Sequence, residues 1–449
     1  MALAIALFGK SAGGDPTALF AWVTGGSLLA IGALISMAGM WTATAAYAGV
    51  FWCFHFGLIA AMASGYISTI DLPEIDAAWI VGPFAGEAAL LALASTFAFA
   101  SGAFMVYAWR GFGPKPDRPD ARHEIAHPYG GVGATLVFGA IASWCIVVLM
   151  TGGLPGFSKS YEDFRDMTSA FSMAIGIISP TLACGIVIAF TGRTGWLRTC
   201  AILAFAGFAL VALPIGLRTD VMFPIVAVIV ASARCGRTFS PLKAGAIALA
   251  LLLLIPVVRE IRTVGLGAMP GAIAAPRLDA LVEMGGSLRP VEQVVRWHAE
   301  GEPYELGASY WAPFERAAAR LLPGLSVTAA ENDLRLMNVL VLDRIGAIGF
   351  SPVAEAYRDF GALGVVFVLG LIGMGLAAID AIRDRRTAVL AIATLYPPLL
   401  INVRNSFVAV PVQCVAGVLL VFGVAFTRHV FASVMTRTYA HPSYVRSQI

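Results

Sequence analysis

The sequence predicts an all-α, polytopic integral membrane protein, and three features of its composition lead to this fold class. Of the 449 residues, 59% are hydrophobic and 13% are charged, whereas about a quarter of the residues in soluble domains are charged. The mean hydropathy is +0.81. Apolar runs of about 18 residues or more, the length that crosses a ~30 Å hydrocarbon core, recur along the chain.

These runs predict eleven membrane helices in a single integral membrane domain that covers residues 1–449. The alternative is twelve helices with both ends of the chain inside, in which a further segment before residue 85 enters the membrane. The expected spans are 17–38, 41–62, 85–109, 129–152, 169–192, 199–217, 219–234, 243–258, 361–381, 387–403 and 405–427.

The distribution of Lys and Arg predicts the orientation, because short loops rich in these residues stay in the cytoplasm. The loop at 63–84, in contrast, has no Lys or Arg. We therefore expect the C-terminus in the cytoplasm, the N-terminus outside and residues 259–360 on the outer, periplasmic face. The basic positions gather at 110–122, 193–198, 234–243, 383–386 and in the C-terminal tail.

Residues 259–360 form a long polar loop that is too polar to lie in lipid and too long to be a simple connection. Within it, Pro290 suits the first turn of a helix and Gly301 suits its end. We expect short amphipathic helices that lie at the membrane surface and form part of the active site. Their patterns fall at 278–285, 289–300, 313–324 and 328–346.

Arginines at the outer ends of the predicted helices suggest an anion-binding site. Arg218 and Arg404 sit in short outer turns, where the charge distribution gives them no topological role. The guanidinium fork donates two parallel hydrogen bonds to phosphate, so a lipid-linked diphosphate is a fitting ligand. A structural alternative is a salt bridge, for example between Arg218 and Asp220. The other candidates are Arg259, Arg262 and Arg289.

Three segments of the loop carry motifs that resemble the Wzy family of O-antigen polymerases. These are LVEMGGSLRPVEQVV at 281–295, YELGASYWAPFERAAARLLPG at 304–324 and GFSPVAEAYRDFGALG at 349–364. The turn GLRTD around Arg218 is similar to an Arg-bearing turn of that family. The matching motif positions are Gly286, Ser287, Gly307, Ser309, Tyr310, Pro323, Ser351, Ala354, Glu355, Tyr357, Phe360, Gly361 and Gly364.

The resemblance implies a glycosyltransferase of the inner membrane. Such an enzyme moves a growing glycan from undecaprenyl diphosphate to a new lipid-linked repeat unit. It implies undecaprenyl diphosphate-linked glycans and membrane lipids as partners, a chain-length regulator protein as a further partner, and no cofactor. The sequence has no metal-ligand spacing, so no metal is expected.

A diphosphate leaving group needs cations, and the acceptor hydroxyl needs a base. Glu355 is the first candidate for this catalytic base, and Tyr357 is a substrate-binding candidate. The alternative for Glu355 is a structural role at the N-terminus of a helix that Ser351 caps. From the catalytic role we expect Glu355→Gln protein at normal levels that makes little polymer. The remaining base candidates are Glu283, Glu315 and His298, whereas His55 is expected to be a packed or hydrogen-bonded helix residue.

Two other readings stay open at the level of sequence. An O-antigen ligase would share the arginines and the outer loop and would differ in its acceptor. A flippase or exporter would spread polar residues through many helices, but the predicted spans have few charges in their middles. A nucleic-acid-binding protein is not indicated, because the net charge is +3 and the basic residues are dispersed.

Overall fold

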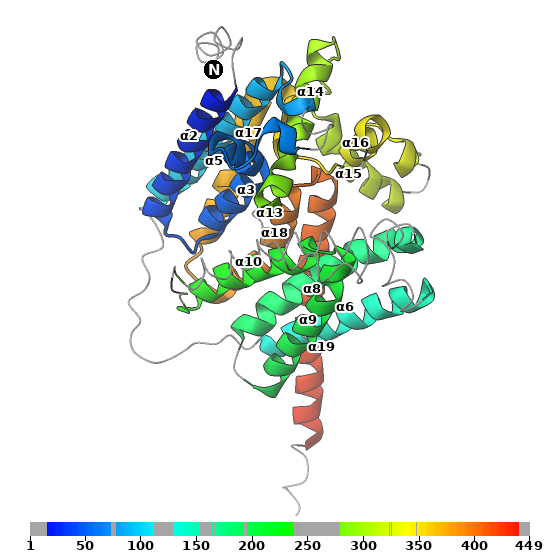
Figure 1. Ribbon diagram of the computed structural model, residues 1–449. Coiled ribbons are helices and arrows are strands. Elements are labelled where there is room, and N and C mark those ends of the chain that lie inside the picture. The colour runs from blue at the N-terminus through cyan, green and yellow to red at the C-terminus, as the bar shows by residue number, and fades with distance from the viewer. Residues whose placement is uncertain are drawn as a thin grey trace, which may run out of the picture.

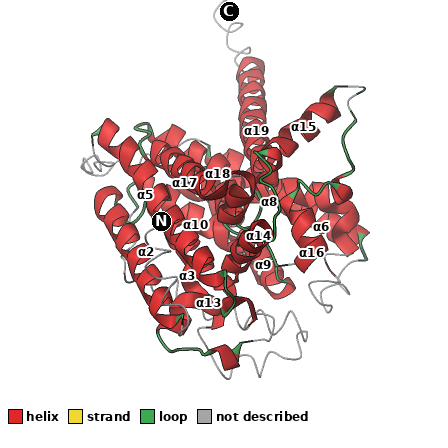
Figure 2. Cartoon of the chain, turned by 90° about the horizontal axis from the view of Figure 1, so that it is seen from above, coloured by secondary structure: helices red, strands yellow, loops and turns green. Residues whose placement is uncertain are grey.

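A computed structural model of the chain describes residues 16–72, 78–111, 129–152, 167–192, 195–237, 279–322, 326–346 and 348–439, with positions 164, 240, 242 and 324. The regular elements within these ranges are α-helices and 3₁₀-helices (Figures 1 and 2). The all-α prediction is therefore confirmed for the described part of the chain.

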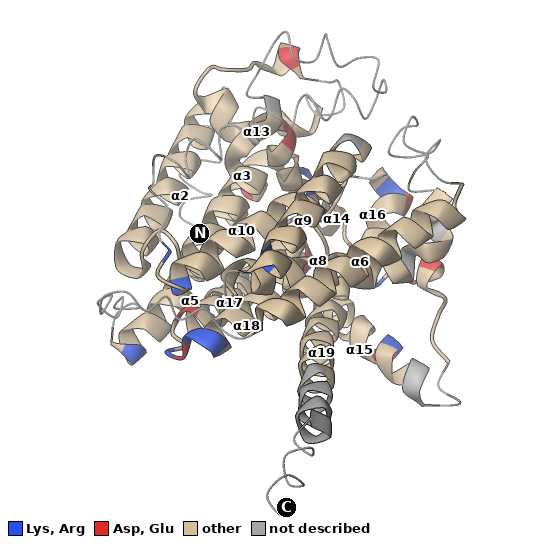
Figure 3. Ribbon diagram, turned by 90° about the horizontal axis from the view of Figure 1, so that it is seen from below, with Lys and Arg blue, Asp and Glu red and all other residues tan. Residues whose placement is uncertain are grey.

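Eight of the described helices are long and apolar enough to cross a membrane, which confirms a polytopic membrane protein. They are Thr17–Ala38, Ala43–Ala63, Ala85–Arg110, Gly130–Met150, Ala174–Thr191, Trp196–Leu213, Pro352–Asp380 and Phe407–Thr427. The charged segments in Figure 3 lie mostly at helix ends and in connections, and long stretches of helix carry no charge.

The long helices follow the predicted spans closely. α2 (Thr17–Ala38) and α10 (Thr219–Arg234) have the predicted bounds. The expected span 243–258 lies outside the described residues, so the total of eleven or twelve remains a prediction. The other helices in this group are α3 (Ala43–Ala63), α5 (Ala85–Arg110), α6 (Gly130–Met150), α8 (Ser172–Thr191), α9 (Trp196–Ile215), α18 (Arg385–Asn402) and α19 (Val410–Tyr439).

Two expected boundaries differ clearly from the structure. α19 ends at Tyr439, twelve residues after the predicted end of its span at 427. The helix that follows the long loop, α17 (Pro352–Asp380), begins nine residues before the predicted start at 361. Ser351 caps it by accepting a hydrogen bond from the Val353 amide at 3.1 Å, and Pro352 is its first residue. The helix kinks at Gly361, whose φ of 67° and ψ of −160° suit glycine. The SPVAEAYRDF segment is therefore itself helical.

Glycines bring α5 and α17 into backbone contact (Figure 1). A Cβ atom on Gly102 would lie 2.1 Å from the carbonyl oxygen of Gly370, and one on Gly373 would lie 2.1 Å from that of Phe99. Small residues permit this close approach of membrane helices, which then gain dispersion contacts along their length. The α5–α17 pair supports the start of α17 and the motif residues on it.

A buried carboxylate fastens the other end of α17. Asp380 accepts hydrogen bonds from the amides of Ala43 and Thr44 at 2.8 and 3.0 Å and from the hydroxyls of Thr44 and Tyr107 at 2.9 and 3.0 Å. The amides belong to the first turn of α3, where a carboxylate satisfies free donors and the helix dipole. Asp380 thus ties together α3, α5 and α17.

The polar loop contains the short helices that the sequence predicts. They are α13 (Asp279–Met284), α14 (Arg289–Ala299), α15 (Ala308–Leu321) and α16 (Met337–Ile345), with the 3₁₀-helix η5 (Gly285–Leu288) between the first two. α14 is amphipathic, because Val291, Val294 and Val295 are buried along one face. Its Pro290 lies in the first turn, as predicted.

Candidate functional site

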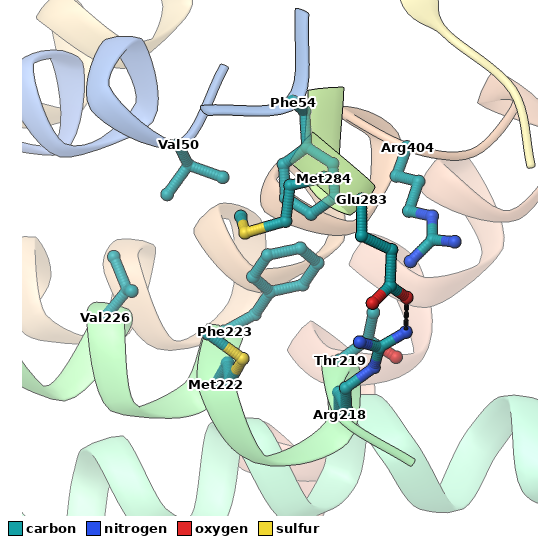
Figure 4. Close-up of a pocket in the computed structure, with 10 residues that line it drawn as sticks. All are labelled: Val50, Phe54, Arg218, Thr219, Met222, Phe223, Val226, Glu283, Met284 and Arg404. Carbon is teal, nitrogen blue, oxygen red and sulfur yellow. Dashed lines mark hydrogen bonds and ion pairs between the residues drawn. The ribbon is translucent and has the colours of Figure 1, made fainter. Parts of the chain in front are cut away.

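Helices α3, α10 and α13 and the turn after α18 enclose a mostly apolar pocket with a volume of about 70 Å³ (Figure 4). Two arginines and one glutamate are its charged residues, and they come from parts of the chain that are far apart in sequence. The lining residues are Val50, Phe54, Arg218, Thr219, Met222, Phe223, Val226, Glu283, Met284 and Arg404.

Arg218 forms an ion pair with Glu283 in this pocket. Arg218 Nη2 lies 2.5 Å from Glu283 Oε1, and the side chains are 10% and 21% exposed (Figure 4). The partner differs from the salt bridge with Asp220 that the sequence suggested, since Asp220 accepts a hydrogen bond from Ser179. Arg218 lies in the short turn immediately before α10, and its side chain lines the pocket.

Arg404 reaches the same pocket from the turn between α18 and α19. Its guanidinium carbon lies 5.9 Å from the centre of the Phe54 ring, within the range of a cation–π interaction. Its carbonyl oxygen accepts a hydrogen bond from the Phe350 amide at 2.8 Å. Gly349, with a φ of 77°, packs beside it, and a Cβ atom there would lie 3.2 Å from the Arg404 carbonyl oxygen. The start of the GFSP segment therefore supports Arg404.

Glu355 does not line the pocket. Its side chain is 0% exposed, and its Oε2 atom accepts a hydrogen bond from the Phe407 amide at 2.7 Å. Phe407 begins the 3₁₀-helix η7 (Phe407–Ala409), three residues after Arg404. The Oε1 atom is buried and has no hydrogen-bond partner among the described residues. The carboxylate thus holds the turn that carries Arg404, and it does not close a capping box with Ser351.

His55 contacts the motif from α3. Its Nε2 atom lies 2.7 Å from the hydroxyl oxygen of Ser351, and its Nδ1 atom lies 3.1 Å from the carbonyl oxygen of Phe51. The expectation of a packed, hydrogen-bonded helix residue is confirmed. Its contact with the residue that caps α17 was missed, because nothing in the sequence pairs positions so far apart.

Tyr357 and His298 belong to a separate aromatic cluster. The Tyr357 hydroxyl donates to Glu87 at 3.5 Å, and its ring centre lies 5.6 Å from that of His298 and 6.2 Å from that of Tyr304. His298 Nδ1 lies 2.7 Å from the carbonyl oxygen of Glu302. Residues two apart on a helix point about 200° apart, and Tyr357 and Glu355 contact different surroundings as this predicts.

Two more motif residues fasten α15 to α17. Arg358 forms an ion pair with Glu305 at 3.0 Å. Asp359 accepts hydrogen bonds from the amide and hydroxyl of Ser309 at 3.3 and 2.5 Å. These bonds hold the first turn of α15 and the residues before it against the kinked start of α17, so Arg358 and Asp359 have a structural role here.

Glu315, one of the base candidates, takes part in a network of the long polar loop. Arg335 contacts Glu315 at 2.7 Å and Asp333 at 3.0 Å, and Arg316 contacts Asp333 at 2.9 Å. Hydrogen bonds from Arg335, with help from Arg316, lower the pKa of Asp333 to about 2. The network joins α15 to the segment before α16, and none of its members lines the pocket.

Arg289 is the other expected arginine that the structure describes. Arg289 begins α14 and does not line the pocket. Arg259 and Arg262 lie outside the described residues. Among the residues that the structure describes, no group of three His, Cys, Asp or Glu side chains is placed to hold a metal ion.

Comparison with known proteins decides the family. Residues 86–433 match the family model described as O-antigen polysaccharide polymerase Wzy. The chain belongs to this family. The match to the Wzy model includes Arg218, Glu283, Glu355 and Arg404, so the charged residues of the pocket lie within the matched part.

A second comparison gives a shorter match. A stretch of 134 residues is 31% identical to Protein CapE of Staphylococcus aureus, and it covers 30% of this chain and 29% of CapE. The match therefore spans less than a third of the length of CapE. No solved structure matches the chain.

Proposed function

We propose that this chain polymerises undecaprenyl diphosphate-linked oligosaccharide repeat units into O-antigen or a related surface polysaccharide. The reaction takes place at the periplasmic face of the inner membrane. The observation that carries the proposal is the meeting of Arg218 and Arg404 in one largely apolar pocket. Both arginines lie in the part of the chain that matches the Wzy family.

The pocket suits the reacting end of such a donor. Two guanidinium groups match the diphosphate, which gains negative charge as the bond to the sugar breaks. Apolar side chains such as Met222, Phe223 and Val226 suit the first part of a prenyl chain. Arg218 and Arg404 are therefore the proposed diphosphate-binding residues, and Arg259, Arg262 and Arg289 remain candidates for the phosphates or the glycan.

The diphosphate leaves without a proton, so the chemistry that the chain must supply is orientation, cations and a base for the acceptor hydroxyl. Glu355 is the base that the sequence predicts, and Tyr357 is the predicted substrate-binding residue. The contacts of Glu355 give it a second role, since it holds the turn that carries Arg404. Glu283 is the carboxylate that lines the pocket.

The proposed orientation follows the basic segments. Residues 383–386 and the C-terminal tail face the cytoplasm, and the short helices of the outer loop face the periplasm. A chain-length regulator protein is a proposed partner at that face. A cysteine placed at position 300 should react with an impermeant reagent in cells whose inner membrane is intact.

Deletion of the gene tests the function through the surface polysaccharide on a gel. A polymerase deletion leaves the lipid core with one repeat unit, a ligase deletion leaves no glycan on the core, and a flippase deletion leaves lipid-linked units in the cytoplasm. The wild-type gene should restore long chains to the deletion strain. Any pattern other than a single repeat unit contradicts the proposal.

Arginine variants in the same strain test the site. Each lost charge-assisted contact costs roughly 1.5–3 kcal/mol, or about one to two decades in rate. Arg218→Ala should therefore give little polymer, and Arg218→Lys should also be impaired, because Lys lacks the planar fork. Arg344→Ala is the matched control, since Arg344 pairs with Glu302 outside the pocket.

A further inference from the structure

We propose that Glu283 is the catalytic base of the transfer and that Arg218 holds it until the diphosphate of the donor displaces it. The inference rests on the proposed function and deepens it. It assigns to one ion pair both the recognition of the donor and the release of the base.

The carboxylate of Glu283 occupies the place that a phosphate oxygen needs. It lies 2.5 Å from Nη2 of Arg218, and both residues line the pocket with Arg404 (Figure 4). Carboxylate and phosphate use the same guanidinium donors. Because the Arg218 side chain is 10% exposed, a diphosphate that reaches it from the pocket competes with Glu283 for those donors.

Backbone packing fixes the helix that carries Glu283. A Cβ atom on Gly57 of α3 would lie 2.3 Å from the carbonyl oxygen of Leu281, and one on Gly285 would lie 2.0 Å from the amide nitrogen of Leu58. α13 and η5 thus rest on the backbone of α3. Displacement from Arg218 therefore rotates the Glu283 side chain, while its Cα atom stays at the wall of the pocket.

The other base candidates lack this position. Glu355 is fully buried and bound to the Phe407 amide. Glu315 is paired with Arg335 in the outer loop. His298 lies in the aromatic cluster with Tyr304. Of these candidates, Glu283 is the one that lines the pocket with the two arginines.

The transfer then balances without a further reactant. Glu283 takes the proton of the acceptor hydroxyl, and the oxygen of that hydroxyl forms a bond to the anomeric carbon of the donor glycan. The bond from that carbon to the diphosphate oxygen breaks, and the electron pair leaves with undecaprenyl diphosphate. Arg218 and Arg404 stabilise the added negative charge. When the diphosphate departs, Glu283 loses its proton to water and pairs with Arg218 again.

The Glu283→Gln variant separates the catalytic role of Glu283 from a structural one. The catalytic role predicts that the variant binds the diphosphate more tightly but makes polymer more slowly. Gln has the shape of Glu but no charge, so it competes less for Arg218 and takes no proton. Undecaprenyl diphosphate without sugar should bind the purified full-length variant about fivefold more tightly than wild type. Polymer formation from lipid-linked repeat units should fall roughly 100-fold or more.

Two further variants complete the experiment. Glu283→Ala should behave as the Gln variant does, and Glu302→Gln, which changes an acid paired with Arg344 outside the pocket, should alter neither quantity. The inference is overturned if undecaprenyl diphosphate binds Glu283→Gln no more tightly than wild type. It is also overturned if the variant makes polymer at a rate within about threefold of wild type. Unchanged binding to Arg218→Ala instead overturns the proposed diphosphate site, so the two failures are distinguishable.

Discussion

Substitution of Glu355 separates the two roles that sequence and structure give this residue. As a base, it would tolerate neither Gln nor Ala. As the acceptor for the Phe407 amide, it should tolerate Gln, whose side-chain oxygen accepts the same hydrogen bond. The structure therefore reverses the expectation from sequence, and Glu355→Gln should keep polymer formation within about tenfold of wild type.

The contacts of the Glu355 side chain determine how much the Ala and Gln variants should differ in stability. Ala leaves the part-buried Phe407 amide without its acceptor, which costs up to about 1–3 kcal/mol, and also empties the space of the buried Glu355 side chain. Gln keeps an acceptor for the Phe407 amide. Its charge-neutral hydrogen bond is weaker by about 1 kcal/mol. The Ala variant should therefore be less stable than the Gln variant by about 1–3 kcal/mol.

Two measurements on the same proteins check this. Thermal unfolding in detergent should rank wild type and Gln above Ala, and polymer on a gel should follow the same order, because the turn with Arg404 loosens in the Ala variant. A Glu355→Gln protein that unfolds as wild type does and makes no polymer would refute the reasoning. It would return the base to Glu355 and remove it from Glu283.

Three further predictions concern the scaffold. Gly102→Val should lower the thermal midpoint sharply, because a Cβ atom meets the Gly370 carbonyl oxygen at 2.1 Å, whereas Gly375→Val, with no atom within 4 Å, is the matched control. Asp380→Asn should also lower it by weakening the cap on α3, and an unchanged midpoint would contradict that role. Because the pKa of Asp333 is lowered to about 2, its ion pairs stabilise the fold above its ordinary pKa of 3.8 and lose this effect as the pH falls towards 2. The difference in midpoint between wild type and Asp333→Asn should accordingly shrink between pH 6 and pH 3, taken as approximate limits.

Hydrophobic runs predicted most of the described long helices, because a membrane span must satisfy its own backbone over a fixed length. The bounds of α2 and α10 were predicted to the residue. The start of α17 was not, because its first turns are polar and read as loop. Ser351 and Pro352 are the residues that mark this start, because they occupy the N-cap and the first position of α17, and the predicted span did not use this signal.

The arginine turns were also visible in the sequence, because Arg218 and Arg404 break the charge pattern of the loops. Their meeting in one pocket was not, since it depends on how α10 packs beside α18 and α3. The contact between Glu283 and Arg218 was not visible in the sequence either, because it depends on the packing of α13 against α3. The charge pattern and the motifs of the sequence therefore identified these charged residues, whereas tertiary packing determined their partners.

We predict that the purified chain extends glycans by itself in vesicles that contain only lipid-linked repeat units. The most direct measurement follows glycan length and free undecaprenyl diphosphate together in such vesicles. The expected result is a ladder of lengths with one undecaprenyl diphosphate released for each unit added, and its loss in the Arg218→Ala, Arg404→Ala double variant. A ladder that persists unchanged in the folded double variant, or the absence of any extension by the wild-type chain, would contradict the central claim.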